Sequence, residues 1–264
     1  MVNMQRKAYV TYGGEFFSSQ KDTSFISAGI VLPHVLSLFN PESVADFGCG
    51  VGTWVRALLD IGVSDVVGID GNYIRDESLV IPDDRFVRAD IAQPVYLDRK
   101  FDLAISMEVA EHLPPERATV FIDTLTRHSD VVLFSAAVPH QGGTHHVNEQ
   151  WPGYWSSLFR SHGYRCVDCL RDVFWEDDRI AWWYRQNMFL FVANDRFSAF
   201  PKLVMEANRP RNMPLTLVHP GFMQKNVGLR QLLNQIPGPL RASLARRWQR
   251  LTMRHPVNSA PSRI

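Results

Sequence analysis

The segment Val44-Ala-Asp46-Phe-Gly48-Cys-Gly50-Val-Gly52-Thr-Trp54 is the most informative stretch of the chain. Its apolar start predicts a buried strand over 43–47, and its end leads into a helix predicted over 52–61. Glycine is needed where the backbone takes a positive φ or lies directly against a ligand. The helix that follows offers unpaired N–H groups at its amino end. The segment therefore predicts a ligand-binding turn at the end of a strand.

The glycine spacing and the acid inside the strand narrow the class of ligand. A dinucleotide-binding turn has the pattern Gly-x-Gly-x-x-Gly or Ala, whereas Thr53 stands at the last small position here. Asp46 places a carboxylate two residues before Gly48, which disfavours a diphosphate. The same carboxylate suits a ligand that carries a cationic amine and a sulfonium. A nicotinamide oxidoreductase is therefore disfavoured.

Two further acids end later predicted strands. Asp70 follows Val-Val-Gly-Ile and lies 20 residues beyond Gly50, where a ribose-binding acid is expected in this type of crevice. Asp90 ends the segment Val-Arg-Ala-Asp and can accept a hydrogen bond from an adenine amino group, with Ile91 against the ring. The three acids together predict an adenosyl ligand beside the glycine turn.

The remaining pattern alternates short apolar runs with helical stretches. Besides the first strand and helix, we expect strands over 65–69, 86–89, 101–107, 131–135, 164–170 and 188–193, and helices over 115–128 and 152–162. This alternation predicts a doubly wound, mostly parallel α/β sheet with both faces covered. No helix is obvious between the last two strands, which predicts an antiparallel pair at one edge. Before residue 40 we expect an aromatic-rich leader and a helix interrupted by Pro33.

Four motifs in order, DFGCGVG, GID, ADI and FDLAISMEVAEH, resemble those of class I S-adenosylmethionine-dependent methyltransferases over roughly residues 40–195. The resemblance implies a Rossmann-like sheet of seven strands with the last strand inserted antiparallel. It implies S-adenosylmethionine as cofactor, with the methionine part near the glycines, the ribose hydroxyls on Asp70 and the adenine at Asp90. The cofactor-binding residues expected are Asp46, Gly48, Gly50, Gly52, Asp70, Asp90, Ile91 and Met107.

Glu108, Glu111 and His112 follow the fourth predicted strand at spacings i, i+3 and i+4. If the segment makes a helical turn, all three project to one face near the cofactor. Two carboxylates and an imidazole can bind a divalent metal such as Mg²⁺, with His146 as a further ligand. The pattern is similar to that of ubiquinone-pathway O-methyltransferases and small-RNA 2′-O-methyltransferases, and this resemblance implies a metal that positions a hydroxyl. Alternatively, the two acids cap helices or order the cofactor pocket.

The loop over 139–151 contains three histidines and is expected to enter the site. His145 or His146 is a candidate general base, because histidine titrates near neutral pH. Glu111 is a further catalytic candidate. Alternatively, the histidines satisfy backbone groups in a surface loop. The nearby aromatic residues predict either a wall against a sugar or aromatic ring, or part of the core: Trp151, Tyr154, Trp155, Trp182, Trp183 and Tyr184.

Charge divides the chain unevenly. Ten of its 28 Lys and Arg lie after residue 206 and none of its 27 Asp and Glu do, so residues 1–206 carry a formal charge of −9. A stripe of Leu240, Leu244, Trp248 and Leu251 predicts a basic amphipathic helix, which can lie on an anionic membrane, on an acidic partner or on its own acidic body. We therefore expect a leader over 1–40, a cofactor-binding domain over 41–195 and a basic C-terminal extension over 196–264.

Composition sets the remaining expectations. The chain of 264 residues is 45% hydrophobic and has no apolar run long enough to span a membrane. Its three cysteines make no disulfide framework, the pair Cys166 and Cys169 is taken as structural, and a cytoplasmic location is expected.

The predicted activity is methyl transfer to a hydroxyl of a small molecule or glycan. The alternatives are a metal-assisted RNA 2′-O-methyltransferase and a non-catalytic module that only binds S-adenosylmethionine. A nucleic-acid partner is disfavoured because the sequence lacks a basic groove interleaved with aromatic residues.

Overall fold

The computed structural model describes residues 14–210 and 213–226, which belong to two compact units, Met1–His219 and Pro220–Ile264. The described part of the second unit is helix α8 (Pro220–Asn226). The boundary follows His219, whereas we expected the extension to begin at residue 196. The predicted amphipathic helix around Trp248 lies outside the described residues, so its membrane or acidic partner stays a prediction.

A seven-stranded sheet forms the centre of the first unit, in the order β3-β2-β1-β4-β5-β7-β6. Its strands are β1 (Ser43–Phe47), β2 (Asp65–Asp70), β3 (Phe86–Arg88), β4 (Leu103–Met107), β5 (Val131–Ser135), β6 (Tyr164–Val167) and β7 (Phe189–Ala193). The strands from β3 to β5 pair in parallel, and β7 is antiparallel to both β5 and β6. The predicted fold class and the inserted antiparallel strand are confirmed. The amino end of β7 therefore lies at the same edge as the carboxyl ends of β1, β4 and β5.

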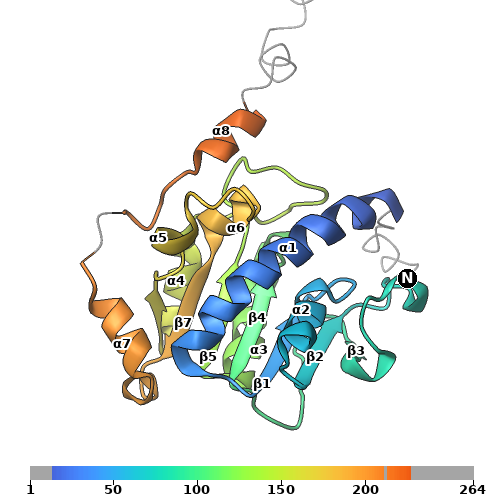
Figure 1. Ribbon diagram of the computed structural model, residues 1–264, viewed down its shortest axis with the longest axis horizontal. Helices are drawn as coiled ribbons and strands as arrows, with labels where there is room; N and C mark the ends of the chain where they lie inside the picture. Colours follow the sequence, from blue (N-terminus) through green and yellow to red (C-terminus); the bar gives the residue numbers. More distant parts are fainter. Residues whose placement is uncertain (1–13, 211–212, 227–264) are drawn as a thin grey trace, which may run out of the picture. The chain divides into compact units, whose positions relative to one another are not determined.

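Helices cover both faces of this sheet. One face packs on α1 (Gly14–Phe39), α2 (Thr53–Ile61), α6 (Trp182–Asn187) and α7 (Pro201–Asn208), and α1 crosses in front of the strands in Figure 1. The other face packs on α3 (Ala118–His128) and α4 (Pro152–Ser161). The 3₁₀ helices span Asp76–Ser78, Asp83–Arg85, Ala110–His112, Pro115–Arg117 and Phe197–Ala199. No described helix has both the length and the apolar character needed to cross a membrane.

Two sequence expectations are corrected. Helix α1 continues through Pro33, because the apolar face of Val31, Leu32 and Val35 is fully buried, and this burial offsets the roughly 3 kcal/mol cost of an internal proline. Two short helices, α5 (Arg171–Phe174) and α6, occupy the segment between β6 and β7, where we expected none.

Buried side chains pack and hydrogen-bond the segment after β7 against the rest of the first unit. Leu203 of α7 is fully buried in the core. The guanidinium of Arg171, also fully buried, pairs with Asp168 at 2.5 Å and donates to the carbonyls of Pro214 and Leu215, both at 3.0 Å. Residues up to His219 are therefore part of the folded unit that carries the site.

Candidate active site

The three glycines after β1 have positive φ but differ in what lies against them. A Cβ on Gly48 would lie 2.5 Å from both methyls of Val109, and one on Gly52 would lie 2.8 Å from Ile81. Gly50, at φ +57°, has nothing within 4 Å in that direction. Packing inside the protein therefore explains two of the glycines, whereas Gly50 leaves open space beside the turn. We call Asp46, Gly50 and Asp70 the glycine-turn site.

Asp70 is 2% exposed and is held by three donors. Its Oδ2 accepts from the amide of Gly50 at 2.7 Å, and its Oδ1 accepts from the amide of Gly71 at 2.6 Å and from the hydroxyl of Tyr73. Burial raises the pKa of the Asp70 carboxyl, and these hydrogen bonds partly offset the rise. The carboxylate that we predicted to bind ribose thus lies directly against the glycine turn.

Asp46 is buried in β1, close enough to Asp70 for the two carboxyls to repel. Burial raises the pKa of Asp46 well above its usual range, and the charge of Asp70 raises it further. Two buried acids side by side favour a positively charged ligand, because a cation would stabilise the ionised form of both. The electrostatics here suit the sulfonium and amine predicted from the sequence.

The remaining predicted cofactor residues lie at the same edge of the sheet. Asp90 is an exposed residue two positions after β3, and its Oδ1 accepts from the amide of Ala92 at 3.0 Å. Ile91 and Met107 are buried, on opposite faces of the sheet. No contact tests their predicted role toward adenine, so that role stays a prediction.

Glu108 follows β4 with a φ of +56° and precedes the 3₁₀ turn Ala110–His112. It therefore lies outside the 3₁₀ turn that contains Glu111 and His112, so the single helical turn expected over all three residues does not form. Its carboxylate accepts from Gln141 Nε2 at 2.7 Å and from Asn187 Nδ2 at 3.1 Å. Burial raises the pKa of Glu108 to about 7.

Glu111 is fully buried, and neither of its carboxyl oxygens has a hydrogen-bond partner among the described residues. Burial raises its pKa well above the usual range, and the nearby charge of Glu108 adds to the rise. Its backbone carbonyl accepts from the amides of Val147 at 2.8 Å and Asn148 at 3.0 Å. These bonds hold the loop between β5 and α4 against the exit of β4.

Two of the predicted histidines join Glu111. Ligand atoms of Glu111, His112 and His146 all lie within 4.8 Å of one another, and we call these residues the Glu111 cluster. The rings of His112 and His146 are perpendicular, with centroids 4.8 Å apart. His146 Nδ1 pairs with Glu149 Oε1 at 2.9 Å. Burial and the two neighbouring histidines lower the pKa of His112 to about 4, which keeps its ring neutral.

The structure thus gathers three of the four predicted metal ligands, and the carboxylate of Glu108, near Glu111, is held by the side-chain amides of Gln141 and Asn187. His145 is exposed, at φ +61°, and is not part of the Glu111 cluster. Tyr73, Gln141, Glu149 and Asn187 were not among the site residues predicted from the sequence. Only Asn187 had a usable signal, because a residue just before an antiparallel final strand must lie at the ligand-binding edge.

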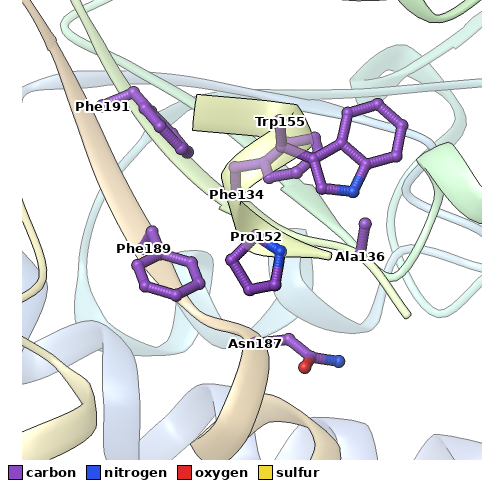
Figure 2. A pocket seen from close by; sticks show the side chains of 7 residues that line it. All are labelled: Phe134, Ala136, Pro152, Trp155, Asn187, Phe189 and Phe191. Atoms are coloured by element: carbon purple, nitrogen blue, oxygen red, sulfur yellow. The ribbon is translucent and has the colours of Figure 1, made fainter. Parts of the chain in front are cut away.

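Two of the six aromatic residues predicted to form a wall are core residues. Trp155 and Tyr184 are buried, and Trp151 is exposed. Figure 2 shows a small pocket beside Asn187, enclosed by β5, β7 and α4 and lined by Phe134, Ala136, Pro152, Trp155, Asn187, Phe189 and Phe191. The indole nitrogen of Trp155 has no hydrogen-bond partner among the described residues. The aromatic rings here stabilise the core next to Asn187.

Comparisons with known proteins agree with this architecture. A probable chloroplastic tocopherol O-methyltransferase of Oryza sativa subsp. japonica is 34% identical over 95 residues, which span 33% of this chain and 26% of the rice protein. The sugar N-methyltransferase KedS8 of Streptoalloteichus superposes with a TM-score of 0.54 at 14% identity, covering 73% of this chain and 98% of KedS8. DesVI of Streptomyces venezuelae superposes with a TM-score of 0.50 at 16% identity, covering 68% of this chain and 96% of DesVI.

The family assignment rests on a separate match, to a family model. A family model described as a methyltransferase domain matches residues 26–167, more than half of the chain, from within α1 to the end of β6. This range contains the glycine turn, Asp70, Asp90 and the whole Glu111 cluster. The chain belongs to the methyltransferase domain family.

Proposed function

We propose that this methyltransferase transfers a methyl group from S-adenosylmethionine to a hydroxyl of a small molecule or glycan. The observation that carries the proposal is the Glu111 cluster, which follows β4 and β5 at the edge that holds the glycine turn. It consists of two histidines and a buried carboxyl that has no hydrogen-bond partner within the described part of the chain. An amine acceptor is already nucleophilic, whereas a hydroxyl must lose a proton during transfer. A group of proton acceptors at this place therefore favours an oxygen acceptor.

The glycine-turn site fits the proposed methyl donor. S-adenosylmethionine supplies an activated methyl group on a cationic sulfur when it is bound. The missing Cβ of Gly50 leaves room for the ligand, Asp70 offers a carboxylate to ribose hydroxyls, and Asp46 adds negative charge. We assign the adenine to Asp90, with Ile91 and Met107 beside it. The enzyme then needs to align the acceptor and exclude water.

His146 is our candidate for the group that takes the proton. Its Nδ1 is paired with Glu149 Oε1, so with the proton on Nδ1 the other ring nitrogen, Nε2, accepts. The carboxylate of Glu149 also accepts from the backbone amides of His140 and Gly142, which fixes its own position. A Cβ on Gly143 would lie 2.1 Å from His146 Nε2, so the loop closes directly over this ring.

The same three side chains could hold a divalent cation such as Mg²⁺ or Mn²⁺, which would position the acceptor oxygen. Ligands on opposite sides of an ion at about 2.1 Å lie about 4.2 Å apart, so the spacing of up to 4.8 Å would have to shrink slightly. The neutral ring of His112 and the unpartnered carboxyl of Glu111 are suitable donors. We therefore propose, more specifically, that a divalent metal ion binds at the Glu111 cluster.

Charge favours a small acceptor over RNA. The segments 107–116 and 136–151, which supply the Glu111 cluster and its surroundings, contain no Lys or Arg. RNA recognition needs cations for the phosphates. The printed names of the rice relative, a tocopherol O-methyltransferase, and of KedS8, a sugar N-methyltransferase, also support a small-molecule acceptor.

The test measures binding and turnover separately. Titration of the purified protein with S-adenosylmethionine, with and without Mg²⁺ or Mn²⁺, should show binding in both conditions. A panel of phenols and sugars should then yield S-adenosylhomocysteine with at least one acceptor. Binding without turnover of any acceptor would favour the non-catalytic module, and the absence of binding would contradict the proposed donor.

Substitution of the candidate base sharpens the test. His146→Ala should lower turnover of the acceptor found in the panel by about 100-fold or more, with unchanged affinity for S-adenosylmethionine. His162→Ala, at the end of α4 and outside the Glu111 cluster, is the matched control and should keep wild-type turnover. Equal turnover of the two variants would contradict the role of His146.

A further inference from the structure

Tyr73 folds back onto the acid that we assign to the cofactor ribose. Its hydroxyl donates to Asp70 Oδ1, although its side chain is on a loop and 41% exposed. A Cβ on Gly71 would lie 2.4 Å from Tyr73 Cε1, so the ring occupies the space that any side chain at position 71 would need. The glycine therefore allows the tyrosine to reach the carboxylate.

The hydrogen bonds that Asp70 already accepts leave its carboxylate too few lone pairs for both hydroxyls of a ribose. Each carboxylate oxygen has two lone pairs. Oδ1 accepts from the amide of Gly71 and from the Tyr73 hydroxyl, which uses both, and Oδ2 accepts from the amide of Gly50, which uses one. One lone pair remains, whereas the two neighbouring hydroxyls of a ribose require two. The two amide donors belong to the backbone, so Tyr73 is the donor that can leave.

We propose that the Tyr73 hydroxyl occupies on Asp70 the hydrogen-bonding position of one ribose hydroxyl, and that the cofactor displaces it on binding. Tyr73 is thereby a specificity-determining residue of the cofactor site. It keeps the buried carboxylate satisfied before the cofactor arrives, and it competes with one of the two ribose hydroxyls. The inference rests on the proposed methyl donor and on its ribose binding at Asp70.

The experiment compares the affinities of wild type and Tyr73→Phe for S-adenosylhomocysteine and for its 2′-deoxy and 3′-deoxy analogues by isothermal titration. Phenylalanine keeps the ring and removes the competing hydroxyl. Tyr73→Phe should bind S-adenosylhomocysteine about tenfold more tightly, the value of one hydrogen bond to a charged group. The analogue that lacks the competing hydroxyl should bind both proteins equally, because there the tyrosine can stay. Tyr96→Phe, another exposed tyrosine, is the matched control and should match wild type.

Each other result is decisive. Equal or weaker binding of S-adenosylhomocysteine by Tyr73→Phe would overturn the competition. The same gain for all three ligands would also overturn it, because the Tyr73 hydroxyl would then weaken binding without competing with one particular ribose hydroxyl. If wild type and both variants fail to bind S-adenosylhomocysteine, the proposed cofactor site fails as well, and this outcome is distinguishable from the other two.

Discussion

The glycine-turn site and the Glu111 cluster lie at the same edge of the sheet but are built differently. Asp70 is held by the backbone of Gly50 and by two groups within three positions of itself. Around the Glu111 cluster, Glu108 is held by side chains 33 and 79 positions away, and the carboxyl of Glu111 has no partner among the described residues. In the first site two backbone amides and one nearby hydroxyl satisfy the carboxylate, whereas the second contains a buried carboxyl, without a partner in the described residues, that can take a proton, a cation or a hydroxyl.

The largest effect is expected from filling the open space at Gly50. Gly50→Val should lower affinity for S-adenosylmethionine by about 100-fold or more, because a side chain would occupy the space against which the ligand lies. Gly62→Val is the matched control, since Gly62 also has a positive φ and open space but ends α2 on its far side. Both variants should lose about 1–2 kcal/mol of stability, and titration should show lost binding in Gly50→Val alone.

A substitution at Gly48 tests whether packing against Val109 requires a glycine at this position. Gly48→Ala should lower the free energy of unfolding by about 3–4 kcal/mol, from overpacking against Val109 together with the strain of a positive φ. Gly50→Ala should cost about 1 kcal/mol. Urea denaturation measures both, and Val109→Ala in the Gly48→Ala background should restore part of the loss. Equal costs for the two glycines would show that packing does not distinguish them.

A smaller effect is expected in the pH dependence of stability. The pKa of Glu108 is raised to about 7 in the folded protein from 4.5, so between these values the folded state binds more protons than the unfolded state. Stability should therefore fall as pH rises through this window, by about 1–3 kcal/mol from this group. Glu108→Gln should flatten the profile, measured by urea denaturation at pH 5 and pH 8. The exposed Glu116→Gln should keep the wild-type profile, and an unchanged profile in Glu108→Gln would contradict the assignment.

The contrast between the two sites also explains what could be predicted from the sequence. The strand 131–135 and the position of Asp70 at the end of a strand were predicted correctly. The pattern of apolar residues, the residues that form turns and the ends of strands are all local signals in the sequence. The burial of Glu111 and its approach to His146 depend on how a loop 35 residues further on folds back, as its amides at Val147 and Asn148 show. No local pattern contains that information. The single helical turn expected over 108–112 does not form for a related reason, because Glu108, a non-glycine residue, takes a positive φ directly after β4.

The most direct test compares the two sites in one titration series with S-adenosylmethionine in metal-free buffer. Wild type and Glu111→Gln should bind with affinities within about threefold of each other, and Gly50→Val should show no measurable binding. That result would assign the donor to the glycine-turn site and leave the Glu111 cluster to the acceptor. Loss of binding in Glu111→Gln comparable to that in Gly50→Val would contradict this division, and so would wild-type affinity in Gly50→Val.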